Sequence, residues 1–352
     1  MNILVINPGS TSTKVSFFIN EENQKTVNYP HTTEELAVYP TINTQIEFRK
    51  SIIFQFLAEN EIKPESLDVV VGRGGILPPV KSGAYEINQR MIDYLLSVTK
   101  IEHPSNLGAI LAEEVRKSAN KKTRALIYDP VSVDEFSEVA RISGLKGVPR
   151  QSIGHALNMR AVAMKTAVDH HSDYKSINMI VAHLGGGNSI SIHEKGRMID
   201  SISDDEGPFS TERTGGLPLK HVIHLCASHT EKEMLQLYKR EGGLFSYAGT
   251  NDARKVEQRI AEGDKNLQIV YEALAYQIAK GIGSLATVVE GKVDFIVLTG
   301  GLSYSEYIVE EIKRRTAFIA PIKIEKGEHE MQALASGAYR VLSGKEQARE
   351  FD

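Results

Sequence analysis

Short apolar runs alternate with longer segments of helical periodicity along the chain. Runs rich in valine, isoleucine and phenylalanine and bounded by turn residues are typical of strands. They occupy residues 3–6, 14–19, 68–72, 124–129, 178–184, 189–194 and 294–300. In residues 267–290, apolar side chains recur at intervals of three or four, which predicts a helix with one apolar face. Strands mixed with long helices indicate an α/β fold.

Two parts of the chain share one order of predicted elements. ILVINPGSTSTKVSFFI from residue 3 and MIVAHLGGGNSISIHEKGRMID from residue 179 each contain an apolar strand, a loop of small residues and an alternating strand. Glycine turns join strands in many folds, so the repeat alone is weak evidence for a duplicated domain. Together with the motifs below, it indicates a duplicated domain. We expect the first domain to comprise residues 1–148 and a returning segment 332–352, and the second to comprise residues 149–331.

Length and composition limit the classes of protein that fit. A chain of 352 residues corresponds to about two domains of ordinary size. The formal net charge of -4 offers no general attraction to nucleic acid or anionic lipid. No apolar run reaches the roughly 18 residues that span a bilayer, and the first residues do not read as a secretory signal. We therefore expect a cytoplasmic protein with no nucleic-acid or membrane partner.

The sequence contains a single cysteine, Cys226, which excludes an internal disulfide. Its neighbours in HVIHLCASH resemble an apolar helix face. We therefore expect a buried, unreactive thiol rather than a reactive one.

The stretch NPGSTSTK, residues 7–14, follows an apolar strand and has the composition of a phosphate-binding loop. A Walker A loop requires a lysine that opens a helix, whereas Lys14 is followed by VSFFI, which favours a strand. The stretch is therefore predicted to be a hairpin loop. Glycine still lets a backbone approach an anion closely, and the hydroxyls of residues 10–13 are further donors.

Two further glycine loops, HLGGGN (183–188) and LTGGLSYSE (298–306), fit the same purpose. The second follows a predicted strand and opens a predicted helix, so its amides and the helix dipole favour negative charge. A tight turn is the usual explanation for any one such loop. Three of them, two in matching hairpins, together predict a nucleotide site.

With these loops and the repeated hairpins, the sequence resembles the acetate and butyrate kinase family, within the superfamily of sugar kinases, heat-shock ATPases and actin. The segments that carry the resemblance occur in family order along most of the chain. They are VINPGSTSTK (5–14), GRGGILPPVKSGAY (72–85), EHPSNLGA (102–109), YDPVSVDEF (128–136), RISGLKGVPRQSIGHALNMRA (141–161), VAHLGGGNSISIHEKGRMIDS (181–201), DDEGPFSTERTGGLP (204–218), LTGGLSYS (298–305) and GEHEMQALASGA (327–338). The resemblance implies two duplicated ribonuclease H-like domains with mixed sheets flanked by helices, and a nucleotide cleft between them.

Within the family, the sequence resembles the butyrate kinases more than the acetate kinases. The chain is shorter than an acetate kinase, GRGG replaces a pattern with two histidines around the arginine, and HLGGGNS replaces a loop with asparagine between its glycines. These differences favour a longer acyl chain than acetate, with butyrate or a branched acid such as isobutyrate expected. Two alternatives stay open: an acetate or propionate kinase, and an ATP-binding member of the superfamily that is not a kinase.

The resemblance implies reversible transfer of the γ-phosphoryl group of ATP to a short-chain carboxylate, which gives an acyl phosphate and ADP. A free aliphatic carboxylate has a pKa of roughly 4.3, so it is already an anion at neutral pH and needs no general base. The site must instead neutralise and align two anions. Arg73 and Arg213 match the arginines of the family that would do this.

The resemblance also assigns histidines and oxygen ligands. His155 and His183 match histidines near the transferring phosphoryl group, and His103 matches a family position whose role is less clear. Magnesium would be held by Asn7, Asp129 and Glu330. The choice between Glu330 and Glu328 stays open, and Asp129 in YDPVS has the alternative role of a turn former.

Further residues are expected to face the phosphates and the nucleotide. Asn7 and Ser10 are favoured in the first loop over Lys14, which begins a strand. The full set is Asn7, Ser10, Ser12, Lys14, Gly185, Gly186, Gly187, Asn188, Gly300 and Gly301. The acyl-tail pocket is not assigned by spacing. The family also implies a homo-oligomer.

Overall fold

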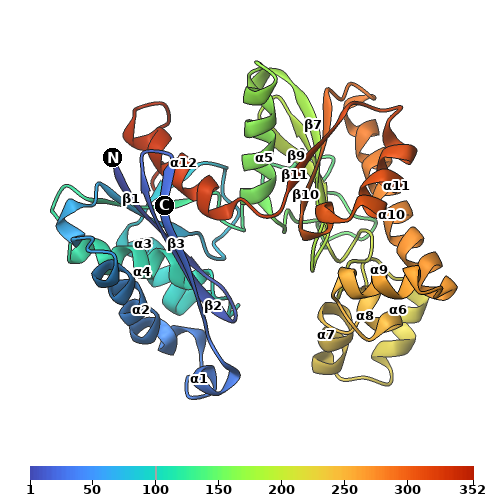
Figure 1. Ribbon diagram of the computed structural model, residues 1–352, viewed down its shortest axis with the longest axis horizontal. Helices are drawn as coiled ribbons and strands as arrows, with labels where there is room; N and C mark the ends of the chain where they lie inside the picture. The colour runs from blue at the N-terminus through green and yellow to red at the C-terminus, as the bar shows by residue number, and fades with distance from the viewer. Residues whose placement is uncertain (100) are drawn as a thin grey trace. The chain divides into compact units, whose positions relative to one another are not determined.

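The computed structural model describes residues 1–99 and 101–352 of the protein (Figure 1). The chain divides into two compact units. Unit 1 comprises Met1–Asp134 and His329–Asp352, and unit 2 comprises Glu135–Glu328. The sequence predicted domain limits at 148/149 and 331/332, whereas the two compact units divide at 134/135 and 328/329. The predicted limits remain a prediction.

Unit 1 is built on a six-stranded mixed sheet with the order β3-β2-β1-β4-β6-β5. The strands β1, β2 and β3 form an antiparallel meander, β4 and β6 run parallel to β1, and β5 pairs antiparallel with β6. Their bounds are β1 (Asn2–Pro8), β2 (Ser12–Ile19), β3 (Glu22–Pro30), β4 (Val69–Arg73), β5 (Ala84–Glu86) and β6 (Arg124–Tyr128).

Helices cover both faces of the unit 1 sheet, which explains why β1 and β4 are apolar without alternation. The helices are α1 (Thr33–Ala37), α2 (Ile46–Glu59), α3 (Gln89–Asp93), α4 (Asn106–Lys117) and α12 (Glu330–Leu342), with 3₁₀ turns at Ile42–Gln45 and Pro64–Ser66 and a π turn at Tyr94–Val98. Residues of α2 and α4 share a core with Leu4, Ile6 and Ile127. Gly337 of α12 packs against Tyr128, whose side chain points to the opposite face.

Unit 2 contains a five-stranded mixed sheet with the order β11-β10-β7-β8-β9. Here β7, β8 and β9 form the antiparallel meander, and β10 and β11 run parallel to β7. The bounds are β7 (Asn178–His183), β8 (Ser189–Glu194), β9 (Arg197–Ile202), β10 (Phe295–Gly300) and β11 (Ile322–Lys326).

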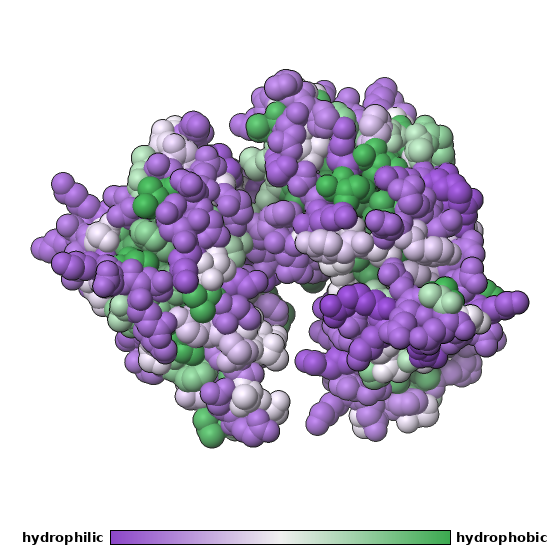
Figure 2. All heavy atoms as spheres, in the orientation of Figure 1, coloured by the Kyte–Doolittle hydropathy of each residue, from purple (hydrophilic) through white to green (hydrophobic). Residues whose placement is uncertain are grey.

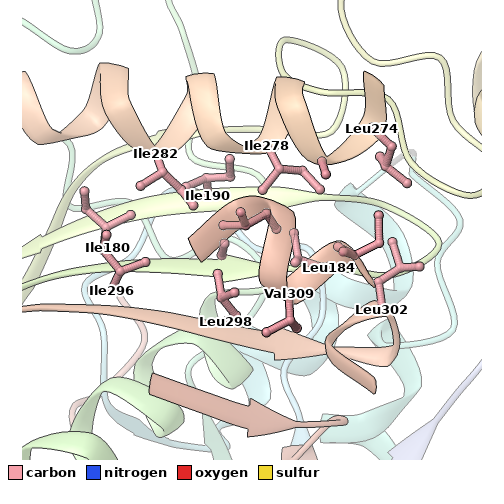
Figure 3. Close-up of a cluster of buried hydrophobic side chains, with 14 of the residues drawn as sticks. Ile180, Leu184, Ile190, Leu274, Ile278, Ile282, Ile296, Leu298, Leu302 and Val309 are labelled. Atoms are coloured by element: carbon pink, nitrogen blue, oxygen red, sulfur yellow. The ribbon is translucent and has the colours of Figure 1, made fainter. Parts of the chain in front are cut away.

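The helices of unit 2 are α5 (Ala156–Asp169), α6 (Leu219–Cys226), α7 (Glu231–Lys239), α8 (Gly243–Ala248), α9 (Ala253–Ala261), α10 (Lys265–Ala286) and α11 (Glu306–Thr316), with 3₁₀ turns at Tyr174–Ser176, Thr287–Val289 and Gly301–Tyr304. In Figure 3, Leu274, Ile278 and Ile282 of α10 point toward the apolar residues of the sheet, such as Ile190. Their three- and four-residue spacing puts them on one helix face, as the sequence predicted. Helix α5 packs against β7 and β10.

The two units repeat one topology. The order β3-β2-β1-β4-β6 in unit 1 corresponds to β9-β8-β7-β10-β11 in unit 2, with antiparallel and parallel pairings in the same places. Each unit therefore begins its sheet with a hairpin that is followed by parallel strands. The prediction of an α/β fold with two duplicated, mixed sheets flanked by helices is confirmed.

The expectation of a buried Cys226 is wrong. Cys226 is the last residue of α6 and is exposed. Helix α6 has the apolar periodicity of a packed helix, yet it contains no buried residue, and Leu219 and Ile223 are exposed.

Most of the surface in Figure 2 is hydrophilic, with apolar residues in small patches. Among the described residues, no helix has the length and apolarity required to cross a membrane.

Helix α4 approaches strand β4 closely because both carry glycine at the contact. A Cβ atom added to Gly72 would lie 2.1 Å from the carbonyl oxygen of Gly108, and one added to Gly108 would lie 2.0 Å from that of Arg73. Backbone atoms cannot move aside as a flexible side chain can. This contact therefore fixes the position of Arg73 at the end of β4.

We predict that Gly108→Ala destabilises unit 1 by about 3 kcal/mol, at the upper end of the usual cost of overpacking. Urea unfolding measures the change. Gly283→Ala in α10 is the matched control, since nothing lies within 4 Å of its added Cβ. That variant should gain up to about 1 kcal/mol from helix propensity. An unchanged midpoint for Gly108→Ala would mean that α4 can shift away from β4 without cost.

Candidate functional site

The parallel strands of unit 1 bring three predicted site residues to one edge of the sheet. β1 pairs with β4 with Ile6 opposite Gly72, and β4 pairs with β6 with Arg73 opposite Tyr128. Asn7, Arg73 and Asp129 therefore stand at or just after the carboxyl ends of neighbouring strands. Ligands of open α/β sheets bind outside these ends.

Asn7, Arg73 and Glu330 form a connected cluster. The Nη1 and Nη2 atoms of Arg73 each lie 3.0 Å from a different carboxylate oxygen of Glu330. The Nδ2 atom of Asn7 donates to Oε2 of the same carboxylate at 2.7 Å. Glu330 is the first residue of α12, where the helix dipole favours its negative charge. Residues far apart in the chain are thus joined by a forked ion pair and an amide.

Asp129 has a strained backbone and a defined partner. Its φ is 40°, a left-handed value that is uncommon for a residue other than glycine. Its side chain is buried, and Oδ1 accepts a hydrogen bond of 2.7 Å from the amide of Gly83. Strained residues of this kind gather at functional sites, although the turn-forming role is also served by this contact.

The stretch NPGSTSTK forms the hairpin between β1 and β2, as predicted. The amide of Gly9 donates to the carbonyl of Ser12 at 2.8 Å and closes the turn. Ser10 is exposed at the tip, whereas Ser12 and Lys14 belong to β2, where Lys14 lies opposite Asn7. His103 lies before α4 and contacts the hydroxyl of Ser105 at 2.6 Å through Nδ1.

Unit 2 presents its histidines at the equivalent sheet edge. His183 ends β7 and is buried, and its ring stacks on that of His155 with centroids 3.9 Å apart. The Nδ2 atom of Asn158 contacts Nδ1 of His183 at 2.9 Å and Oγ1 of Thr299 at 3.3 Å. With Asn158 donating to Nδ1, a neutral His183 carries its proton on Nε2. That atom lies 3.9 Å from Oε1 of Glu328.

The glycine loop between β7 and β8 is held by its own asparagine and by a second segment. The amide of Gly185 donates to Oδ1 of Asn188 at 3.1 Å, and Nδ2 of Asn188 donates to the carbonyl of Phe209 at 2.8 Å. The hydroxyl of Ser210 donates to the carbonyl of Gly186. The loop is therefore ordered by polar contacts before any ligand arrives.

Arg213 lies beside this loop and forms an ion pair with Asp204. Both residues border Gly187, because a Cβ added there would meet Asp204 and Arg213. Burial lowers the pKa of the Arg213 guanidinium. Its Nε is buried and has no hydrogen-bond partner among the described residues. Arg213 is therefore held between Asp204 and the Gly187 loop.

A cavity of about 810 Å³ in unit 2 joins two of the predicted glycine loops. This volume lies in the range of small-molecule sites. Its lining includes Gly185 and Gly186 from one loop, Gly301 from the other, and a segment at the start of α9. The complete lining is Gly185, Gly186, Thr211, Glu212, Asn251, Asp252, Ala253, Arg254, Glu257, Gly301, Leu302, Tyr304 and Ser305.

The LTGG loop leads into α11 through a short 3₁₀ turn. Gly300 has a φ of 90° and forms backbone hydrogen bonds with Gly327, and Gly301 lines the cavity. Ser305 caps α11 and donates to Glu257 at 2.5 Å, and Tyr271 donates to the same carboxylate oxygen at 2.8 Å. Glu257 thus ties α9 and α10 to the loop.

Several of these residues were missed from the sequence. Asn158 was inside the GHALN motif, three residues after His155 and so on the same helix face, which was a usable signal. Asp204 was inside a recognised segment. The segment 251–254 and Glu257 carry no motif that spacing alone would reveal, because their role depends on how α9 packs.

The oxygen donors proposed for magnesium are partly gathered. Asn7 and Glu330 are in contact, and Asp129 follows β6, which is separated from the strand of Asn7 by β4. Among the described residues, no group of three or more His, Cys, Asp or Glu could hold a metal ion without other ligands. Mg²⁺ commonly binds through one or two carboxylates, water and substrate phosphates, so this donor set fits it. Glu328 instead lies near His183.

Comparisons with known proteins agree with this architecture. A sequence model of the Acetokinase family matches residues 150–347. The chain is 45% identical to Butyrate kinase 1 and 44% identical to Butyrate kinase 2 of Clostridium acetobutylicum, and both alignments cover 99% of each chain.

Solved structures resemble the whole chain. An acetate kinase from Porphyromonas gingivalis superposes with a TM-score of 0.79 at 19% identity, covering 97% of this chain and 99% of that one. A propionate kinase from Francisella tularensis superposes with a TM-score of 0.77 at 17% identity, covering 96% and 98%. These likenesses show a shared fold. The sequence matches also show the family, and the chain belongs to the Acetokinase family.

Proposed function

We propose that the protein is a butyrate kinase, which reversibly transfers the γ-phosphoryl group of ATP to butyrate and gives butyryl phosphate and ADP. The observation that carries the proposal is the identity of 44–45% over the full chain to two proteins named as butyrate kinases. The clusters around Arg73 in unit 1 and Arg213 in unit 2 supply the cations that such a transfer requires.

In this proposal, Arg73 binds the carboxylate substrate. A planar guanidinium suits a carboxylate, and because Glu330 engages one N–H of each Nη atom, the substrate would meet the N–H groups that this pair leaves. Glu330 and Asn7 hold the guanidinium in place from one side. Butyrate arrives as an anion, so the site orients a ready nucleophile and does not have to remove a proton.

Arg213 and the two histidines stabilise the transferring phosphoryl group. Charge spreads over three oxygens of this group in the transition state, and fixed donors in a partly buried site stabilise it strongly. Nε2 of His183 is a donor whose orientation is set by Asn158, and His155 is held against it by stacking. Ion pairing with Asp204 keeps Arg213 in place until the phosphates arrive.

The nucleotide occupies the cavity of unit 2 in this proposal. The loops of Gly185 to Gly187 and Gly300 to Gly301 offer backbone amides to the phosphates, and the cavity is large enough for a nucleotide. Ser10 and Ser12 contribute hydroxyl donors from the first hairpin. Bound Mg²⁺ would neutralise phosphate charge, and Asn7, Glu330 and Asp129 are the residues that would hold it.

Two further expectations belong to this proposal: a homo-oligomer and a cytoplasmic location. The exposed apolar residues of α6, such as Leu219 and Ile223, are a candidate contact surface. The mass of the protein in solution, from light scattering, is the quantity that decides the oligomer.

We predict that the catalytic efficiency with ATP is highest for butyrate or a branched acid of similar length. A hydroxamate trap with acids from acetate to valerate measures this profile. The highest efficiency with acetate or propionate would favour the alternative carboxylate kinases. Retained ATP binding without acyl phosphate formation from any acid would favour a member that is not a kinase.

We predict that Arg213→Ala lowers kcat by about 100-fold or more, because a cation aimed at the developing charge is lost. Arg314→Ala is the matched control, since Arg314 lies on the exposed side of α11 and pairs with Glu311. The control should retain wild-type kinetics, and both variants should retain the wild-type circular dichroism spectrum. Near-normal turnover by Arg213→Ala would remove this residue from the mechanism.

We predict that Glu330→Gln raises the Mg²⁺ concentration for half-maximal activity by about tenfold, because a hard carboxylate ligand becomes a neutral amide. Glu328→Gln is the control, because Glu328 is near His183 rather than in the Asn7 cluster. Magnesium titrations of both variants at saturating ATP and butyrate give the comparison. A larger shift for Glu328→Gln would assign the metal to that residue instead.

A further inference from the structure

Arg49 of α2 is completely buried, although its side chain carries a charge. Such burial is rare for arginine unless a carboxylate accompanies it. Within the described residues 1–99 and 101–352, no carboxylate lies within ion-pair distance of Arg49. Burial lowers the pKa of its guanidinium to about 10, so the group is still a cation at neutral pH.

The neutral partners of Arg49 belong mainly to the hairpin loop between β1 and β2. Nη2 donates to the carbonyl of Gly9 at 2.9 Å, and Nη1 donates to the carbonyl of Ser12 at 2.9 Å and the hydroxyl of Thr13 at 3.0 Å. Its Nε donates to Gln45 at 3.0 Å. The guanidinium therefore binds both ends of the loop tip, at Gly9 and at Ser12 and Thr13.

A second contact extends the network. The hydroxyl of Thr13 lies 2.8 Å from Nε2 of His31, whose pKa is lowered by burial and by the charge of Arg49. A neutral His31 adds no second charge. Burial and the missing carboxylate thus both oppose a positive charge at this position.

We propose that Arg49 is a positioning residue for phosphoryl transfer: it fixes the Gly9–Thr13 loop in the shape that receives phosphate and supplies a permanent positive charge behind it. The inference rests on the proposed function, in which this loop meets the phosphates. An anion in front of the loop supplies the negative charge that the protein does not place beside Arg49. A guanidinium suits this role because its planar fork reaches several carbonyls at once.

A purely structural role makes a different prediction. If Arg49 only fills space, an apolar side chain of similar length should replace it better than lysine, because a buried charge without a partner is costly. If its charge and hydrogen bonds serve the reaction, lysine should be the better substitute. The order of activity of the two variants therefore separates the roles.

The test compares Arg49→Lys and Arg49→Met with Lys50→Met as the matched control. Lys50 is the next residue of α2, and its ion pairs are with Glu47, which is exposed, and with Glu114, which is half-buried. We expect Arg49→Met to lower kcat by about 100-fold and Arg49→Lys by about tenfold, in line with the loss of a preorganised electrostatic contact. The KM for butyrate should stay within about twofold in both variants, and Lys50→Met should behave as wild type.

Three results would overturn the proposal: activity of Arg49→Met equal to or above that of Arg49→Lys, unchanged kcat in both, or loss of activity that only follows the unfolded fraction in thermal melts. If Arg49→Met does not fold, Arg49→Lys decides alone: a kcat lowered by about tenfold with the KM for butyrate within about twofold supports the proposal, and an unchanged kcat overturns it.

Failure of the proposed function gives a separate result. In that case wild type and Lys50→Met form no butyryl phosphate. Calorimetric titration with ATP then decides the role of Arg49. At least tenfold weaker binding by Arg49→Met than by Lys50→Met supports the proposal, and equal binding overturns it.

Discussion

Backbone hydrogen bonds between parallel strands determine where the candidate site residues of each unit lie. In unit 1, the register of β1, β4 and β6 leaves Asn7, Arg73 and Asp129 at one edge of the sheet. A shift of one residue in any pairing would turn these side chains to the opposite face. The close approach of Gly72 and Gly108 holds α4 against β4 and so fixes the strand that carries Arg73. Packing between backbones thus supports the position of the guanidinium.

Unit 2 places a different set of polar side chains at the same edge of the same topology. His183 ends β7, and Thr299 and Gly300 end β10, with Asn158 of α5 joining the first two. The duplication supplies two rigid supports, and the loops that follow the strands differ. One hairpin tip contains hydroxyl residues and is held by a buried arginine, whereas the other contains three glycines and is held by Asn188 and Ser210. The shared scaffold therefore carries two distinct sets of donors.

The sequence was sufficient for features that depend on local pattern. Strand runs, the long amphipathic helix α10 and the hairpin at NPGSTSTK follow from periodicity and from the strand preference of VSFFI. Contacts between distant segments could not be derived in this way. Asn7 and Glu330 are 323 residues apart, and only the packing of α12 brings them together. The prediction that Cys226 is buried was wrong for a related reason. An apolar stripe on α6 does not reveal whether another element covers it.

The late position of α12 in the chain has a consequence for synthesis on the ribosome. Helix α12 packs on β1, β4 and β6, and Glu330 completes the ion pair of Arg73, yet both follow all of unit 2 in the sequence. While unit 2 is being translated, the nascent unit 1 has an uncovered sheet face and an arginine without its carboxylate. Unit 1 can therefore finish folding only after its last segment, residues 329–352, has left the ribosome, and the Arg73 cluster is incomplete until then.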